Sequence, residues 1–138
     1  MDHPKDSDMD KIKKARHIVC DAGRQLLARG LVEGTWGNCS LRIDEKRMAI
    51  TPSGRRYEDL TADDIVIMDY HTLAVEGDIR PSSEKKLHAR IYQTRKTIHA
   101  VIHTHQPNAS TVAAARRDLP PILDDQAQIL GPSVRCAA

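Results

Sequence analysis

Aromatic residues are scarce in this 138-residue sequence, which contains no phenylalanine, one tryptophan and three tyrosines. A buried core must therefore be built from isoleucine, leucine, valine, methionine and alanine. Long apolar runs are also lacking, and none approaches the roughly 20 residues that a membrane-spanning helix needs. Residues 1–10, MDHPKDSDMD, are acidic and polar, unlike a secretory signal peptide. These features predict a globular protein with no membrane partner.

The sequence also lacks a strong excess of charge and a set of paired cysteines. Its net charge of +2 gives little reason to expect binding to nucleic acid or to a membrane surface. The three cysteines, Cys20, Cys39 and Cys136, are odd in number and widely spaced. This pattern argues against a disulfide framework and favours a reducing compartment, so we predict a cytoplasmic protein.

The residues that are present alternate between helical and strand-like patterns. Residues 1–9 are predicted to be a flexible tail and residues 10–138 a single domain. Apolar residues recur every three or four positions from Asp10 to Gly30, which predicts a helix. Short or alternating apolar runs predict strands at 39–43, 48–51, 65–68, 73–75 and 99–104. Because these strands come in hairpins with helices between them, we predict an α/β fold with a largely antiparallel sheet.

Further helices are predicted after the first hairpin. One starts at Ser82 and Ser83 and ends near Arg95 and Lys96, with Leu87 and Ile91 facing inward and Tyr92 as a further candidate for that face. A short helix or turn is predicted over 57–64, and two more helices over 107–116 and 124–130. Pro107 suits the first turn of the 107–116 helix, because the N–H group that proline lacks has no hydrogen-bond partner in a first turn.

The strongest chemical signal is His103-Thr104-His105 at the end of an apolar strand. Histidines two residues apart on a strand point to the same face. With the carboxylate of Glu84 one helix away, they could form a metal site with a catalytic base beside it. Two polar residues at a strand end, one of them buried and hydrogen-bonded, would explain the same pattern.

A second signal is a set of polar loops that could surround an anion. Ser82 and Ser83 precede Glu84 at a predicted helix start, where a simple helix cap explains them well. The same hydroxyls and free N–H groups could also bind phosphate. Each of the loops Gly37-Asn38 and Ser53-Gly54 is a turn by itself, but together they could complete an anion cradle. His88 lies one helical turn from Glu84 and could simply pair with it.

Four motifs together, GTWGN, ITPSG, PSSE and AVIHTH, resemble in their order and spacing the class II aldolase/adducin family, typified by L-fuculose-1-phosphate aldolase. The resemblance covers residue 10 to the chain end. It implies a three-layer α/β/α fold with a central, mostly antiparallel sheet, whose C-terminal part is missing from this chain. It also implies a homotetramer with active sites between subunits.

The resemblance further implies roles for particular residues. The substrate phosphate would be held by Gly37, Asn38, Ser53, Gly54, Ser82 and Ser83. One Zn²⁺ per subunit would be bound by His103 and His105, with Glu84 as a further ligand and as the residue that transfers a proton. The family's third zinc histidine would lie beyond residue 138. Trp36 stands where the family usually has a small residue. Asp124 lies near the place where some fuculose-phosphate enzymes position a tyrosine.

The predicted function is therefore a zinc-dependent aldolase, a lyase that cleaves a small ketose phosphate such as L-fuculose 1-phosphate to dihydroxyacetone phosphate and an aldehyde. A pentulose-phosphate 4-epimerase and a methylthioribulose-phosphate dehydratase of the same fold are alternatives. Glu84 favours the aldolase, because the epimerases usually have aspartate there. An inactive fragment or an adducin-like interaction module is a further alternative, and the two retained histidines argue against the latter.

Overall fold

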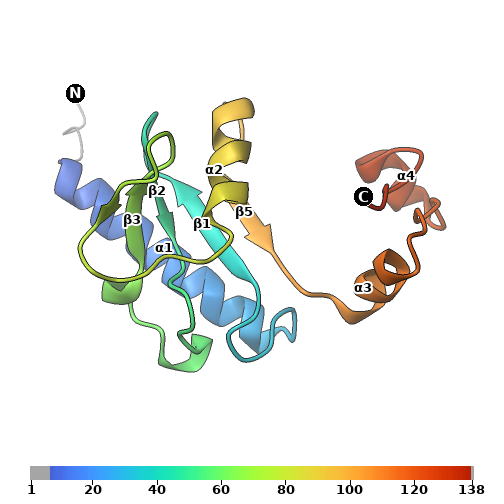
Figure 1. The fold of residues 1–138 in the computed structure, drawn as a ribbon, viewed down its shortest axis with the longest axis horizontal. Helices are drawn as coiled ribbons and strands as arrows, with labels where there is room; N and C mark the ends of the chain where they lie inside the picture. The colour runs from blue at the N-terminus through green and yellow to red at the C-terminus, as the bar shows by residue number, and fades with distance from the viewer. Residues whose placement is uncertain (1–6, 138) are drawn as a thin grey trace, which may run out of the picture. The chain divides into compact units, whose positions relative to one another are not determined.

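The computed structural model describes residues 7–137, and its contacts divide the chain into two units, Met1–Thr104 and His105–Ala138 (Figure 1). The assignment of residues 10–138 to a single domain stays a prediction. Residues 1–6 of the predicted tail lie outside the described residues. Met9 belongs to a helix, so the ordered chain begins earlier than the sequence predicted.

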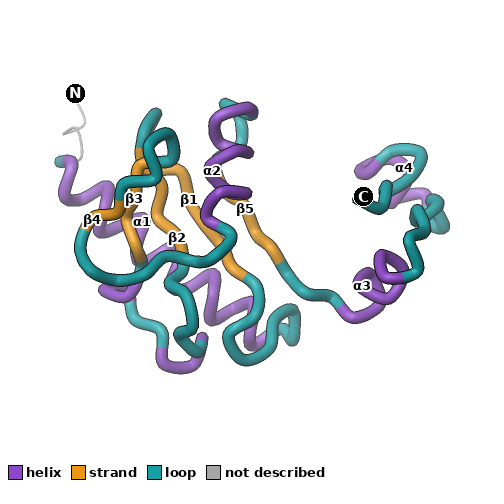
Figure 2. The backbone as a smooth tube through the Cα atoms, in the orientation of Figure 1, coloured by secondary structure: helices purple, strands orange, loops and turns teal. Residues whose placement is uncertain are grey.

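A five-stranded antiparallel sheet forms the centre of the first unit (Figure 2). Its strands are β1 (Asn38–Arg42), β2 (Arg47–Ile50), β3 (Val66–Asp69), β4 (Val75–Glu76) and β5 (Ala100–His103), in the spatial order β4-β3-β2-β1-β5. Every pair is antiparallel, which confirms the predicted sheet. The register of β1 against β5 places Asn38 opposite His103.

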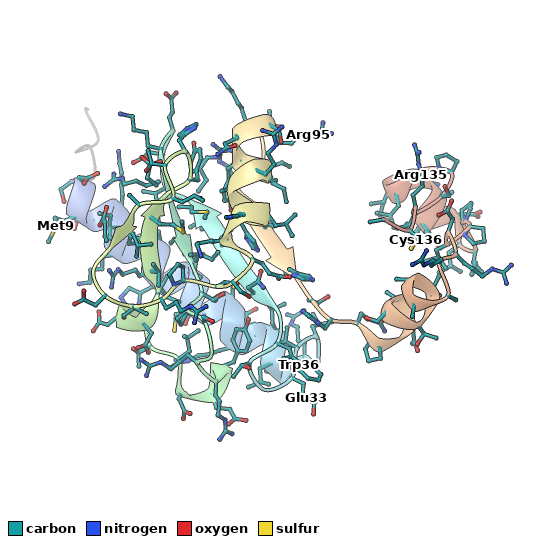
Figure 3. All side chains as sticks on the ribbon, in the orientation of Figure 1. Met9, Glu33, Trp36, Arg95, Arg135 and Cys136 are labelled. Atoms are coloured by element: carbon teal, nitrogen blue, oxygen red, sulfur yellow. The ribbon has the colours of Figure 1, made fainter. Side chains whose placement is uncertain are left out.

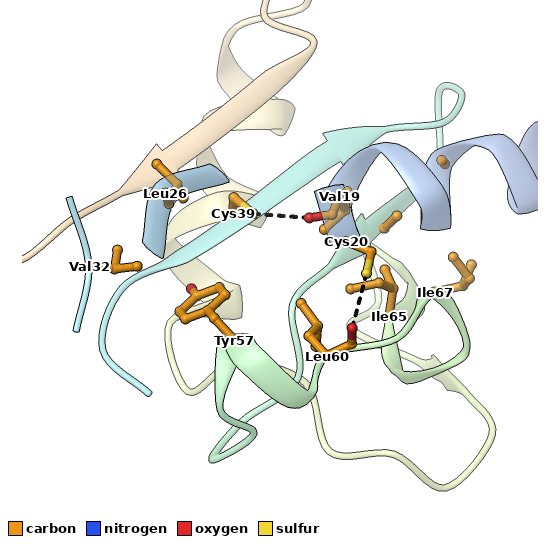
Figure 4. Close-up of a cluster of buried hydrophobic side chains, with 11 residues drawn as sticks. Val19, Cys20, Leu26, Val32, Cys39, Tyr57, Leu60, Ile65 and Ile67 are labelled. Carbon is orange, nitrogen blue, oxygen red and sulfur yellow. Dashed lines mark hydrogen bonds between the residues drawn. The ribbon is translucent and has the colours of Figure 1, made fainter. Parts of the chain in front are cut away.

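Helix α1 (Asp8–Ala28) covers one face of this sheet. Ser7 caps it and forms a reciprocal capping box with Asp10, which is why the helix begins two residues before the predicted start. Its buried residues pack against Cys39, Ala49 and Ile67 of the sheet (Figure 4). The other members of this cluster are Ala15, Val19, Cys20, Leu26, Val32, Tyr57, Leu60 and Ile65.

Helix α2 (Lys85–Thr94) covers the opposite face, so the unit has the three α/β/α layers that the resemblance implied. Ala89 and Tyr92 pack there against alternate residues of β2 and β3, namely Met48, Ile50, Val66 and Met68. The prediction that Leu87 faces inward is wrong, because Leu87 is 50% exposed and His88 is buried in its place. Hydrogen-bonding partners on β1 make a polar residue acceptable at that buried position.

Shorter elements connect these layers and form the second unit. The predicted turn over 57–64 is a pair of 3₁₀ helices, η1 (Tyr57–Asp59) and η2 (Ala62–Asp64), the second with Thr61 and Asp64 in a capping box. The second unit contains α3 (Pro107–Ala114) and α4 (Asp124–Leu130), both starting where the sequence predicted. All three cysteines are free, in agreement with the prediction of no disulfide framework. None of the helices formed by residues 7–137 has the length and apolar character needed to cross a bilayer.

The exposure of Leu87 on α2 can be tested with two alanine substitutions, where Ile67 serves as a fully buried reference on the α1 face of the sheet. Ile67 is completely buried between the layers, so Ile67→Ala should lower the free energy of unfolding by about 2–5 kcal/mol. Leu87→Ala should change it by less than about 1 kcal/mol, since half of the side chain already contacts solvent. Chemical denaturation followed by circular dichroism measures both. A loss in Leu87→Ala as large as that in Ile67→Ala would show that α2 buries the face that the sequence suggested.

Candidate functional site

Glu84, His103 and His105 form the group of possible metal ligands that stands out among residues 7–137. One ligand atom from each lies within 4.8 Å of the others. Glu84 is the N-cap residue of α2, His103 is the last residue of β5, and His105 follows two residues later. Two imidazoles and a carboxylate are a common ligand set for zinc and related ions. The structure thus brings together the three residues that the sequence proposed as metal ligands.

The carboxylate of Glu84 is held by contacts from two strands. Its Oε2 atom accepts a hydrogen bond from the Nδ2 atom of Asn38, 2.5 Å away. The same oxygen pairs with Nδ1 of His103, which lies directly opposite Asn38 in the sheet. Asn38 was predicted to bind phosphate, and here its amide is 95% buried against Glu84. Neighbouring strands therefore aim both groups at one carboxylate oxygen.

Gly37 lets the backbone approach His103 closely. Its φ angle is 77°, in the left-handed region that favours glycine. A Cβ atom at this position would lie 2.8 Å from the carbonyl oxygen of His103 and 2.6 Å from Cγ1 of Val32. Both separations are shorter than van der Waals contact, so a side chain here would displace the end of β5. Trp36, which precedes this glycine, is 62% exposed on the surface (Figure 3).

The two serine-containing loops lie side by side. The N–H of Ser53 donates to the carbonyl of Arg80 at 2.9 Å, and the N–H of Ser82 donates to the carbonyl of Thr51 at 3.0 Å. Ser53 and Ser83 are exposed, and so is Gly54. These two backbone hydrogen bonds bring four of the six predicted phosphate-binding residues next to the start of α2.

Ser82 has a structural task at that helix start. It is 95% buried, and its Oγ atom accepts a hydrogen bond from the N–H of Glu84 at 3.2 Å. The simple explanation from the sequence, that this serine caps the helix, is thus supported in part, although Glu84 itself occupies the N-cap position. The bond fixes the backbone from which the Glu84 carboxylate extends.

His88 is buried in the structure and has two hydrogen-bond partners on β1, rather than the pairing with Glu84 that the sequence left open. Its Nδ1 atom lies 2.7 Å from Oγ of Ser40, and Nε2 lies 2.5 Å from Oδ1 of Asn38. The side chain is fully buried, and burial lowers the pKa of His88 from 6.5 to about 4, so it is neutral at pH 7. The signal was present in the sequence: Asn38 and Ser40 share one face of a strand, and Glu84 and His88 share one face of a helix.

A model of the class II aldolase and adducin N-terminal domain matches residues 17–138 of the chain. The chain belongs to the class II aldolase and adducin family. The family resemblance deduced from the four motifs is thereby confirmed, and so is the fold that it implied.

Several relatives in this family are named as enzymes of sugar phosphates. The 5-deoxy-D-ribulose 1-phosphate aldolase of Bacillus thuringiensis serovar kurstaki is 36% identical over 127 residues, which are 91% of this chain and 59% of that protein. The methylthioribulose-1-phosphate dehydratase of Marinobacter nauticus is 40% identical over 77% of this chain and 51% of its own length. An L-ribulose-5-phosphate 4-epimerase of Salmonella paratyphi C is 40% identical over 79% of this chain and 48% of its own length.

A solved structure of an L-fuculose 1-phosphate aldolase has the same fold. It superimposes with a TM-score of 0.72 at 38% sequence identity, covering 78% of this chain and 51% of the aldolase. The chain thus spans about half the length of the curated relatives and of the solved structure that it matches. Family membership supports an enzyme of this family, and these proteins differ in the reaction that their names give.

The close approach at Gly37 predicts a specific defect in metal binding. Gly37→Ala should weaken the binding of Zn²⁺ by about 10-fold or more, because the new methyl group would push the His103 carbonyl away. Gly77→Ala is the matched control, because Gly77 also has a positive φ angle but no atom within 4 Å of the new Cβ. Titration calorimetry with Zn²⁺ measures both variants. Equal affinities in the two would show that Gly37 serves only the local backbone conformation.

Burial of neutral His88 predicts that stability falls with acidity in a defined range. The pKa of His88 is about 4 in the folded chain and 6.5 when exposed, so the unfolded chain binds the proton more readily. The contribution of neutral His88 to the free energy of unfolding is complete above pH 6.5 and is lost as the pH falls toward 4. The loss amounts to up to about 3 kcal/mol, because each pKa unit corresponds to about 1.4 kcal/mol.

The buried carboxylate of Asp64 changes its protonation in a lower pH range. Despite burial, hydrogen bonds from Thr61 hold the pKa of Asp64 below its ordinary 3.8. Denaturant titrations from pH 7.5 to 4 should therefore show a loss in the wild type that His88→Gln reduces. An unchanged slope in that variant would rule out His88 as the origin of the pH dependence.

Proposed function

We propose that the protein is a zinc-dependent aldolase that cleaves a small ketose phosphate into dihydroxyacetone phosphate and an aldehyde. The observation that supports this most is the group of Glu84, His103 and His105 beside the paired serine loops. The relative that matches 91% of this chain is named as an aldolase of a ketose 1-phosphate, and so is the solved structure described above. L-Fuculose 1-phosphate is the substrate we would test first.

The residues present fit a zinc ion. His103 and His105 would supply two imidazole nitrogens and Glu84 a carboxylate oxygen, all three within reach of one ion. A bound ion would act as a Lewis acid on the carbonyl oxygen of the substrate.

Glu84 is the residue we assign to proton transfer. Its carboxylate is half-buried and accepts hydrogen bonds at Oε2, which keeps it pointed at one place. Its backbone is fixed by the start of α2 and by the Ser82 hydroxyl. A carboxylate so placed can remove a proton from one substrate atom and return it to another, which both directions of an aldol reaction require.

The substrate phosphate is proposed to bind between the two serine loops. The exposed residues Ser53, Gly54 and Ser83 offer hydroxyl and N–H donors, and the adjacent N-terminus of α2 adds the positive end of a helix dipole. Ser82 would contribute mainly by holding Glu84, and Gly37 mainly by its closeness to His103. Asn38 would contribute either to the phosphate or to Glu84.

An epimerase or a dehydratase is the second candidate, because relatives named for these reactions are 40% identical to the chain. The reactions are distinguishable by their products. An aldolase releases dihydroxyacetone phosphate, which a coupled dehydrogenase detects. An epimerase gives only a diastereomer of the same pentulose phosphate, and a dehydratase releases water without breaking a carbon–carbon bond. An adducin-like module or an inactive chain would show none of these.

The assembly implied by the family is a homotetramer, and we propose it for this chain as well. Light scattering coupled to size-exclusion chromatography measures the mass directly. A mass of about 15.4 kDa, that of one chain, would contradict the proposal.

The role of Glu84 predicts a separation between binding and chemistry. Glu84→Gln should reduce the rate of cleavage by a factor of 100 or more, because the amide cannot accept and return the proton. The affinity for inorganic phosphate should be unchanged, since the serine loops are intact. His103→Ala should instead lose Zn²⁺, as measured by metal analysis after dialysis. Full turnover in Glu84→Gln would remove this residue from the mechanism.

A further inference from the structure

A buried chain of hydrogen bonds connects α2, β1 and the candidate site. It runs from the hydroxyl of Tyr92 to Ser40 at 2.8 Å, from Ser40 to His88 at 2.7 Å, from His88 to Asn38 at 2.5 Å and from Asn38 to Glu84 at 2.5 Å. The first four side chains are each at least 95% buried. We propose that His88 is a positioning residue, which sets the orientation of the Asn38 amide and through it the placement of the Glu84 carboxylate.

The direction of every hydrogen bond follows from the end at Glu84. A carboxylate oxygen only accepts, so Asn38 must turn its Nδ2–H₂ group toward Glu84. The Oδ1 atom of the same amide then faces His88 and must accept. His88 therefore has its proton on Nε2, because a donor is needed at that position.

The other half of the chain follows in the same way. A neutral imidazole with its proton on Nε2 has a lone pair on Nδ1, so the hydroxyl of Ser40 donates to it. The Ser40 oxygen is then free to accept from the hydroxyl of Tyr92. Burial raises the pKa of Tyr92 to about 12, so its proton is present at neutral pH. One tautomer of His88 thus satisfies all four bonds.

The opposite tautomer would disrupt the site. A proton on Nδ1 would leave Nε2 as an acceptor and would favour an Asn38 amide turned by 180°. The Oδ1 atom would then face Oε2 of Glu84, placing two oxygens that both carry negative charge in contact. His88 thereby decides whether Asn38 attracts or repels the carboxylate proposed for proton transfer. Residues outside the first contact layer of a metal site commonly have this effect, at about 10- to 100-fold in activity or affinity.

The tautomer can be measured without any activity. In ¹⁵N-labelled protein at pH 7, nitrogen chemical shifts should show His88 protonated at Nε2. The side-chain amide protons of Asn38 should exchange slowly with water, and His88→Leu should accelerate this exchange. A proton on Nδ1, or an exchange rate of Asn38 that His88→Leu leaves unchanged, would overturn the proposal whether or not the protein is an aldolase.

The consequence for catalysis rests on the proposed function and has its own test. His88→Leu should lower kcat for cleavage of the ketose phosphate by about 10- to 100-fold with KM changed by less than about 3-fold. His88→Gln, which retains an N–H donor near the place of Nε2, should restore most of the rate. His99→Leu is the matched control on an exposed histidine and should behave as the wild type.

Circular dichroism and thermal unfolding of the three variants exclude a general loss of structure. A rise in KM at constant kcat would contradict the proposal, because it would assign Asn38 to the phosphate. Equal rates in His88→Leu and wild type would contradict it too. If the wild type cleaves no ketose phosphate, the proposed function fails, and the nitrogen shifts still decide the orientation of Asn38.

Discussion

The hydrogen bond between Asn38 and Glu84 is the interaction on which the arrangement of the site depends. It joins the first residue of β1 to the N-cap residue of α2, which lie 46 positions apart in the sequence. A buried amide must find partners on both of its ends, or burial costs about 1–3 kcal/mol for each unsatisfied group. His88 of α2 supplies the second partner of the Asn38 amide. The placement of the Glu84 carboxylate therefore depends on how α2 packs against β1.

The polar chain also explains how α2 sits on the sheet. Beside this polar chain, the contacts between α2 and the sheet are apolar: Ala89 and Tyr92 pack against the methionines and aliphatic residues of β2 and β3. Arg42 makes further contacts near the C-terminal end of α2. Its guanidinium lies over the rings of Tyr70 and Tyr92 and donates a hydrogen bond to the main-chain carbonyl of Tyr92. Apolar packing thus supplies most of the stability, while the polar contacts specify a single orientation of the helix.

The residues of the three polar loops differ in burial and therefore in what they can contact. Gly37 lies close to the backbone of His103, and Ser82 accepts a hydrogen bond from the backbone of Glu84, so both fix the backbone of a candidate ligand. Ser53, Gly54 and Ser83 are exposed and can reach a ligand. The six residues with one predicted role therefore divide into two groups. Gly37, Asn38 and Ser82 lie against the candidate metal ligands, and Ser53, Gly54 and Ser83 are exposed enough to contact a phosphate. A sequence motif cannot make this distinction, because both groups are the same polar and small residues.

Sequence alone determined the strands, the helix boundaries to within a few residues, the free cysteines and the family, because these depend on local periodicity and on short motifs. It also selected Glu84, His103 and His105 as candidate metal ligands, from the spacing of the two histidines on one strand and from the motifs PSSE and AVIHTH. Only the tertiary structure decided which face of α2 is buried and that His88 bonds to Ser40 and Asn38. Those facts depend on how α2 packs on β1, between residues 46 to 50 positions apart in the sequence, and such a long-range contact is not encoded in a local pattern.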